Sequence, residues 1–169
     1  MPYRLTDRRL LLAGAAIAAL AIALRRQRRR PTEAVRPTGP HVLILGGGWA
    51  GIYTALALER VLPEASLTLV NRDNFFLFTP LLPEVAASAV DTRHIVNPIR
   101  RLFRRAQFVE GDVEAIDLVA RRVTTRHPSG HQHEHRYDHL VLALGGVSNF
   151  FGMQDVARQS IPMKSLGDA

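Results

Sequence analysis

Glycines at the spacing of a dinucleotide-binding site follow a short apolar run in residues 41–51, which read HVLILGGGWAG. Gly46, Gly48 and Gly51 form the pattern Gly-x-Gly-x-x-Gly. The first glycine permits a sharp turn from strand to helix, the second permits the backbone to approach a pyrophosphate, and the third permits close packing of helix on strand. Free N–H groups at the start of the following helix would then face the phosphates.

The segments around these glycines have to place the loop at the end of a parallel sheet. The apolar residues Leu43 to Leu45 suit a buried parallel strand, and residues 52–61 suit a helix. Residues 66–71 (SLTLVN) supply a second strand, which completes a β–α–β unit of about 30 residues. This setting favours a dinucleotide site over the alternative of an ordinary glycine-rich turn.

The chain after Asn71 predicts further strands and one more helix. The aromatic run of residues 75–82 is cut by Pro80, so it predicts a buried loop rather than a strand. The apolar residues after Pro98 have helical spacing as far as Arg105. Strands are expected over residues 107–109, 112–117, 121–127, 131–137 and 139–144. They predict a small antiparallel meander and a late core strand that ends at glycine.

Positive charge is concentrated in the first 40 residues. The chain of 169 residues has a formal charge of +7, and its first 40 residues hold nine Arg against Asp7 and Glu33, which is also +7. From His41 onward 13 basic residues balance 13 acidic ones, so the folded part is neutral and a nucleic-acid partner is not expected. The chain has no cysteine, which excludes disulfides, thiolate metal sites and cysteine redox chemistry within it.

An apolar run of 15 residues, 10–24 (LLLAGAAIAALAIAL), is flanked by arginines on both sides. A helix of this length spans about 22 Å, against about 30 Å of hydrocarbon core. Arginine snorkelling and bilayer thinning can close this gap, so residues 1–30 are predicted to be a membrane anchor. The five arginines after the run outnumber those before it, which places the folded part on the cytoplasmic side. A cleaved export signal and a basic stretch lying along anionic lipid are the alternatives.

The sequence therefore divides into three parts. Residues 1–30 are the predicted anchor, residues 31–40 (PTEAVRPTGP) a proline-rich linker, and residues 41–169 the folded domain. The predicted fold class is α/β: a Rossmann-like domain with a parallel sheet and a small antiparallel meander, preceded by an N-terminal transmembrane helix.

Five histidines lie in or beside the expected hairpin, namely His127, His131, His133, His135 and His139. Strand alternation places three of them on one face, a spacing that suits metal ligands, but no carboxylate or thiolate follows the same pattern. We interpret them as a solvated hairpin face and expect no metal site.

Four segments together resemble the N-terminal FAD domain of the type II NADH dehydrogenases, which are single-subunit NADH:quinone oxidoreductases. The segments are HVLILGGGWAGIYTA, LTLVNRDNFFLFTPLLPEVA, EGDVEAID and YDHLVLALGGVSNFFG, and the resemblance covers residues 41–169. It implies a flavoenzyme in which NADH reduces FAD and the flavin reduces a membrane quinone without proton pumping. It also implies contact with membrane lipid and leaves a homodimer open.

The resemblance assigns cofactor-binding roles by position. The glycine loop would hold the FAD pyrophosphate through Gly46, Gly48, Trp49, Ala50 and Gly51. Asn71 and Arg72 would stand beside the adenosine ribose, although the family usually has an acidic residue there. The amide oxygen of Asn71 can still accept a ribose hydroxyl, so weaker cofactor selection is expected rather than loss of the cofactor.

Other positions correspond to the flavin ring and adenine. Thr79 and Pro80 would lie near the isoalloxazine ring, and the backbone of Val113 would contact adenine. Ala143 and Gly145 belong to a second flavin motif, in which Leu144 replaces the usual threonine. No catalytic side chain is implied, because the electron transfers belong to the flavin.

The family also has parts that this sequence does not show. A second glycine motif for NADH and a late Gly-Asp flavin motif are missing, so we expect a fragment that is inactive by itself. The alternatives are a truncated, non-catalytic, membrane-tethered flavin-binding protein and another FAD- and NAD(P)-dependent oxidoreductase of the same superfamily. Disulfide reductases and sulfide:quinone reductases need cysteines, which this chain lacks.

Overall fold

The computed structural model describes residues 38–169. The predicted anchor over residues 10–24 and most of the predicted linker lie outside the described residues. Among residues 38–169, no helix combines the length and the apolar character needed to cross a bilayer.

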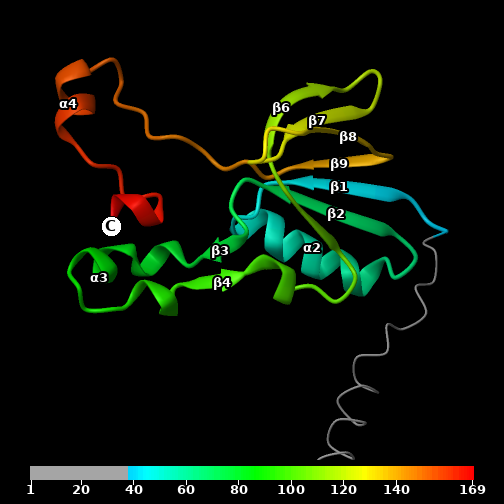
Figure 1. Ribbon diagram of the computed structural model, residues 1–169, viewed down its shortest axis with the longest axis horizontal. Coiled ribbons are helices and arrows are strands. Elements are labelled where there is room, and N and C mark those ends of the chain that lie inside the picture. Colours follow the sequence, from blue (N-terminus) through cyan, green and yellow to red (C-terminus); the bar gives the residue numbers. More distant parts are fainter. Residues whose placement is uncertain (1–37) are drawn as a thin grey trace, which may run out of the picture. The chain divides into compact units, whose positions relative to one another are not determined.

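A four-stranded parallel sheet in the order β5-β2-β1-β9 forms the centre of the described part (Figure 1). Its strands are β1 (His41–Leu45), β2 (Ser66–Asn71), β5 (Gln107–Glu110) and β9 (His139–Leu142). Helix α2 (Trp49–Val61) connects β1 to β2, which pair in register from His41↔Ser66 to Leu45↔Val70. The predicted β–α–β unit and the predicted strands at residues 107–109 and 139–144 are thus confirmed, although β9 ends two residues early.

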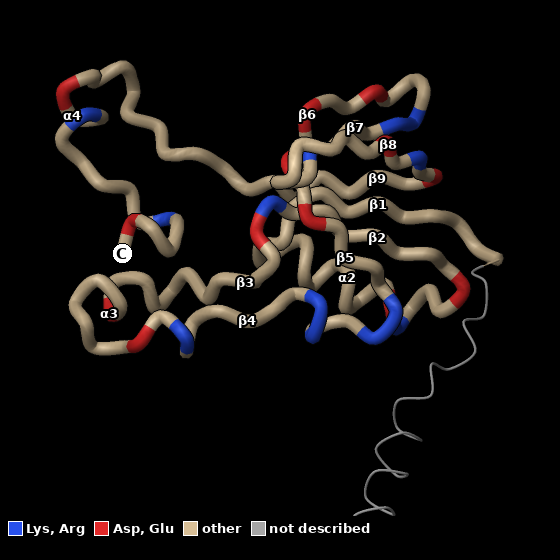
Figure 2. The backbone as a smooth tube through the Cα atoms, in the orientation of Figure 1, with Lys and Arg blue, Asp and Glu red and all other residues tan. Residues whose placement is uncertain are grey.

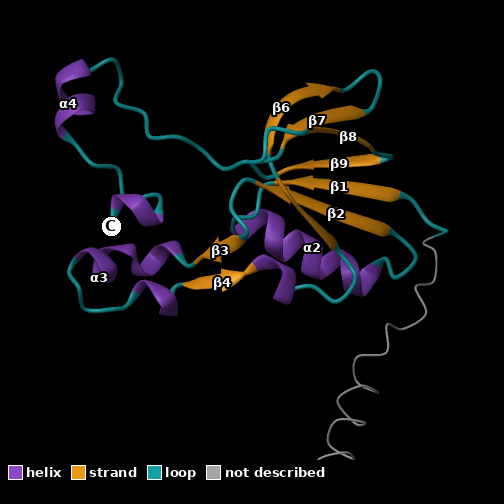
Figure 3. Cartoon of the chain, viewed as in Figure 1, coloured by secondary structure: helices purple, strands orange, loops and turns teal. Residues whose placement is uncertain are grey.

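The two faces of β1 pack against different layers (Figure 3). Val42 and Ile44 join a core cluster with Ile52 and Ala55 of α2. Leu43 and Leu45 belong to a second cluster, which includes residues of the meander. Burial on both faces explains why the strand is apolar at consecutive positions instead of alternating with polar residues.

The meander covers the face of the sheet opposite α2. Its strands are β6 (Asp112–Asp117), β7 (Arg122–Arg126) and β8 (Gln132–Arg136), and they pair antiparallel in that order. A register shift between Val113 and Ala115 interrupts the β6–β7 pairing. Val123 and Tyr137 are buried against the sheet. This confirms the predicted meander.

A two-stranded arm corrects the prediction of a loop over residues 75–82. Strand β3 (Phe75–Leu77) pairs antiparallel with β4 (Val96–Pro98), so the aromatic run begins as a strand. Pro98 is tolerated because β4 is an edge strand of this two-stranded arm. After β3 the chain forms the 3-10 turn η1 (Thr79–Leu81), helix α3 (Leu82–Ala86) and the 3-10 turn η2 (Thr92–His94).

The helix predicted after Pro98 is also wrong, because only the 3-10 turn η3 (Ile99–Arg101) forms there. The backbone N–H groups of Arg104, Arg105 and Ala106 donate to the carboxylate of Glu59 on α2, at N–O distances of 2.6–3.1 Å to its nearer oxygen. The Glu59 side chain thus takes the donors that helix formation would direct at preceding carbonyls, and the chain turns into β5.

The last described segment returns to the β3–β4 arm. It contains α4 (Gln154–Gln159) and the 3-10 turn η4 (Leu166–Asp168). Leu166 packs against the buried cluster of Leu82, Val85 and Ile95. The Nζ atom of Lys164 donates to the carbonyl oxygen of Gly146 at 3.0 Å.

Candidate functional site

The carboxyl ends of three neighbouring strands bring the predicted site residues together. The glycine loop follows β1, Asn71 ends β2, and Ala143 follows β9. Because all three strands are parallel, these segments meet at one edge of the sheet, which we name the carboxyl edge. In open α/β sheets this edge is where ligands bind.

Two glycines of the loop occupy positions where no side chain fits. Gly46 has a φ of +111°, and a Cβ atom built on it would lie 2.1 Å from the carbonyl oxygen of Ala143. A Cβ atom on Gly51 would lie 1.8 Å from the carbonyl oxygen of Gly46. The loop therefore folds directly over the first turn of α2 and against the end of β9, as the spacing of the motif predicts.

Asn71 fixes the loop through Gly47, a residue that sequence reasoning left out of the site. The side-chain oxygen of Asn71 accepts the backbone N–H of Gly47 at 2.8 Å, and its amide nitrogen donates to the carbonyl oxygen of Asp73 at 2.9 Å. A Cβ atom on Gly47 would lie 2.7 Å from Cγ of Asn71. The run of three glycines was the signal that could have revealed this contact.

The start of α2 has the properties of an anion site. No side chain caps the helix at its N-cap residue Gly48, and its first turn, which includes Trp49 and Ala50, holds no acidic residue. A Cβ atom on Gly48 would meet no atom within 4 Å. The helix N-terminus thus presents N–H groups and partial positive charge toward open space.

Trp49 connects the glycine loop to Thr79. Its Nε1–H lies 3.3 Å from the hydroxyl oxygen of Thr79, which precedes Pro80 in η1. Its ring stacks on Tyr53 with centroids 5.6 Å apart, and it meets Phe76 edge-on at 5.1 Å. The two segments that the family resemblance assigns to the pyrophosphate and to the flavin ring are therefore adjacent.

The remaining predicted residues lie around the same edge. The backbone N–H of Gly111 donates to the carbonyl oxygen of Asn71 at 2.9 Å, so β6, with Val113 as its second residue, begins close to the end of β2. Arg72 lies 3.6 Å from a carboxylate oxygen of Asp112, with both side chains largely exposed. Gly145 has a φ of +73° and nothing within 4 Å of a built Cβ atom.

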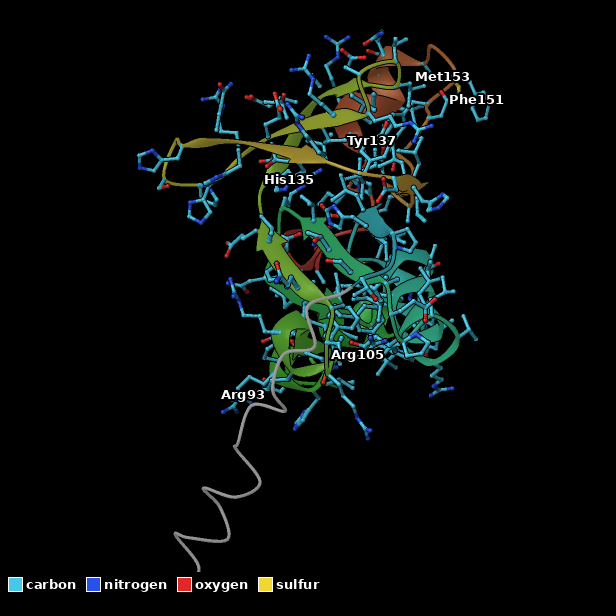
Figure 4. The ribbon with its side chains drawn as sticks, turned by 90° about the vertical axis from the view of Figure 1, so that its right-hand side faces the viewer. Arg93, Arg105, His135, Tyr137, Phe151 and Met153 are labelled. Carbon is cyan, nitrogen blue, oxygen red and sulfur yellow. The ribbon has the colours of Figure 1, made fainter. Side chains whose placement is uncertain are left out.

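The histidines of the meander differ in burial. Nε2 of His135, which is labelled in Figure 4, lies 2.9 Å from the hydroxyl oxygen of the fully buried Thr125, whereas His131 and His133 are exposed. The expectation of a wholly solvated face is thus wrong for His135, whose pKa is lowered by burial and by the nearby His133 and His41. Among the described residues no three potential ligands gather around one point.

This arrangement defines a Rossmann-like, dinucleotide-binding domain. An uncapped helix N-terminus, a loop that excludes side chains and a polar acceptor at the end of β2 suit a diphosphate joined to a ribose.

Residues 40–169 match the family model of the pyridine nucleotide-disulphide oxidoreductases, and the chain belongs to this family. It is 34% identical over 136 residues to the external alternative NAD(P)H-ubiquinone oxidoreductase B4 of Arabidopsis thaliana mitochondria, covering 76% of this chain and 23% of that protein. It is 32% identical over 136 residues to the type II NADH:quinone oxidoreductase Ndh of Mycobacterium tuberculosis, covering 79% of this chain and 29% of that protein.

Among solved structures, the NDH2 of Plasmodium falciparum in complex with NADH has a TM-score of 0.67 and 22% identity, covering 76% of this chain and 27% of that one. This likeness supports the fold. The chain thus spans about a quarter of the length of these proteins. The resemblance to type II NADH dehydrogenases seen in the sequence is confirmed.

Proposed function

We propose that the carboxyl edge binds FAD and that this chain is the flavin-binding part of a non-proton-pumping NAD(P)H:quinone oxidoreductase. The observation that carries the proposal is the uncapped start of α2 next to Gly48, where the fold leaves open space in front of free N–H groups. The names of the relatives in Arabidopsis and Mycobacterium supply the substrate classes, a nicotinamide dinucleotide and a quinone.

The chain's own residues would bind and orient the cofactor. The N–H groups of Gly48, Trp49, Ala50 and Gly51 would donate to the pyrophosphate oxygens. The Asn71 oxygen already accepts one N–H, and its second lone pair is available to a ribose hydroxyl. The remaining contacts follow the sequence prediction, with Arg72 and Val113 toward the adenosine and with Thr79, Pro80, Ala143 and Gly145 toward the flavin ring.

The chemistry would come from the cofactor, since bound FAD accepts a hydride and passes electrons onward. The protein's part is to hold the ring system in place and to limit water around it. Trp49, Phe76 and Phe78 form the apolar surroundings next to Thr79, because both phenylalanine rings meet the indole ring at 5.1 Å.

Attachment to a membrane is the second part of the proposal. The quinones named for the relatives are lipid-soluble, and the apolar run of residues 10–24 between arginines suits an anchor in lipid, with the folded domain on the cytoplasmic side. The proposed boundaries between anchor, linker and folded domain lie near residues 30 and 40.

The experiment that tests the proposal uses the protein extracted in detergent from its source membrane. We expect the native protein to oxidise NADH in a quinone-dependent reaction. We expect it to release FAD when it is denatured. A membrane protein without bound flavin and without this activity would contradict the proposed function.

A further inference from the structure

Glu110 is the last residue of β5 and brings a carboxylate to the carboxyl edge. The residue is partly buried. None of the ion pairs within the described residues 38–169 includes Glu110. A carboxylate has two oxygens that accept hydrogen bonds, and it gains most from a donor where part of its water has been removed. Glu110 therefore has the capacity to accept a hydrogen bond from a ligand at this edge.

Glu110 lies beside Asn71, the residue at the end of β2. The two residues are in register in the parallel pairing of β2 with β5. The pair before them on the same face, Leu69 and Phe108, is buried in the core cluster that includes residues of α2. Because strand side chains alternate between faces, Asn71 and Glu110 also lie on the α2 side, on strands about 4.8 Å apart. The two side chains therefore border the same part of the carboxyl edge.

The side chain of Asn71 can serve only one ribose hydroxyl. Its nitrogen donates to the carbonyl oxygen of Asp73, and its oxygen accepts the N–H of Gly47, which leaves one lone pair. An adenosine ribose presents a pair of neighbouring hydroxyls, at C2′ and C3′. Dinucleotide sites of this topology hold the ribose with a carboxylate, whose charge strengthens the hydrogen bond. Asn71 is neutral and cannot supply that charge.

Two other acidic residues near the end of β2 are less suited to this contact. Asp112 lies 3.6 Å from Arg72 and so has a cationic partner. Asp73 is exposed and follows the end of β2 by two residues. Figure 2 shows blue next to red backbone in the turn after β2, where Arg72 and Asp73 follow each other. Of the three carboxylates, only that of Glu110 belongs to a partly buried residue.

We propose that Glu110 accepts a hydrogen bond from a hydroxyl of the adenosine ribose and supplies the negative charge that Asn71 lacks. This inference rests on the proposed function, in which FAD binds at the carboxyl edge. The carboxylate selects for a ribose with free hydroxyls, because a hydroxyl bonds strongly to a charged acceptor. It selects against a phosphate at C2′, because that phosphate would meet like charge. Glu110 thus makes the edge specific for FAD over a dinucleotide phosphorylated on this ribose.

The test measures FAD binding to the full chain by flavin fluorescence, and the displacement of FAD by three probes. The probes are ADP, 2′,3′-dideoxy-ADP, which lacks both hydroxyls, and ADP with an added phosphate at C2′. We expect the wild type to bind ADP most tightly of the three.

The deciding variant is Glu110→Gln, which removes the charge and keeps the size of the side chain. It should bind FAD and ADP about tenfold more weakly and lose most of the preference for ADP over the dideoxy analogue. It should bind the 2′-phosphorylated probe more tightly than the wild type does, because the like charge is gone. A purely structural role would weaken all three probes alike. The melting temperature should stay that of the wild type, since no ion pair is lost.

Two further variants separate this contact from a general effect of charge. Asp73→Asn removes the same charge from the turn after β2 and keeps the carbonyl group that binds Asn71. It should leave the affinity for every probe within about twofold of the wild type. Asn71→Asp combined with Glu110→Gln moves the carboxylate to the neighbouring strand, and should restore the preference for ADP over the dideoxy analogue.

The outcomes separate this inference from the proposed function. If the wild type does not bind FAD, the proposed function fails and this inference fails with it. If the wild type binds FAD but Glu110→Gln treats the probes as the wild type does, or Asp73→Asn gives the same losses, the role of Glu110 is wrong and the FAD site stands. A wild type that binds the 2′-phosphorylated probe as tightly as ADP would overturn the inference without any variant.

Discussion

Gly51 has the least room of the residues in the candidate site. A methyl group there would lie 1.8 Å from the carbonyl oxygen of Gly46, so the loop and α2 have to separate in Gly51→Ala. We expect a loss of about 1–3 kcal/mol in the free energy of unfolding, measured by urea denaturation. Gly146→Ala is the matched control, because a Cβ atom there meets nothing within 4 Å. Equal stability of the two variants would contradict the loop geometry.

Asn71 is expected to stabilise the glycine loop as well as to contact the cofactor. Asn71→Ala removes the acceptor of the Gly47 N–H group and should cost about 1 kcal/mol of stability, together with weaker FAD binding. Asn71→Asp keeps an acceptor and should retain the loop, while its charge strengthens a hydrogen bond from a ribose hydroxyl. Thermal unfolding and an FAD titration of both variants check this, and a more stable alanine variant would refute it.

His135 predicts how stability changes with pH. Burial holds the pKa of its folded form below the ordinary value of 6.5, so the unfolded chain binds the proton more readily. The contribution of His135 should be fully present above about pH 7 and should be lost as the pH falls below about 6.5. His135→Gln can still bond Thr125 and should show a flatter dependence between about pH 7 and pH 5 in thermal unfolding. A steeper pH dependence in this variant would contradict the lowered pKa of His135.

Glu59 and Arg105 hold the connection between α2 and β5 from both sides. The Glu59 carboxylate accepts three N–H groups of the connection, while the Arg105 guanidinium donates to carbonyls at the end of α2. Glu59→Ala leaves those N–H groups without their partner and should lower the free energy of unfolding by about 1–3 kcal/mol. Glu64→Ala, at an exposed residue shortly after α2, should change it by less than about 0.5 kcal/mol. Chemical denaturation of both variants decides whether this connection is structural.

The same connection shows where sequence patterns were sufficient and where they failed. Strands β1 and β2 were predictable because burial on both faces leaves a continuous apolar run between a glycine motif and a turn. The segment after Pro98 has helical spacing but no helix, because its donors bond to Glu59, about 45 residues earlier in the chain. Local periodicity contains no information on such a partner.

The candidate site, too, was predictable from the sequence only in part. The roles of Gly46 and Gly51 follow from the motif, because its glycines stand where the backbone of another segment comes too close for a side chain. The contacts of Gly47 with Asn71, and of Trp49 with Thr79, join segments more than 20 residues apart and became visible only in the fold. The half-buried state of His135 depends likewise on a neighbouring strand that places Thr125 beneath it.

At the scale of the whole molecule, the described part consists of a core and a carboxyl edge to which we assign the cofactor. The central claim is that the carboxyl edge binds FAD through the uncapped start of α2. A variant that fills this space without disturbing the fold isolates that claim. Gly48→Ser qualifies, because the site accepts a Cβ atom and serine is a better N-cap than glycine.

The most direct measurement is therefore a titration of the full chain with FAD, followed by the change in flavin fluorescence, alongside the melting temperature. The wild type should bind saturably, and Gly48→Ser should bind at least about tenfold more weakly with an equal or higher melting temperature. Gly146→Ser should match the wild type in both readouts. If the wild type does not bind FAD, or if Gly48→Ser binds it equally well, the site assigned to the carboxyl edge is wrong.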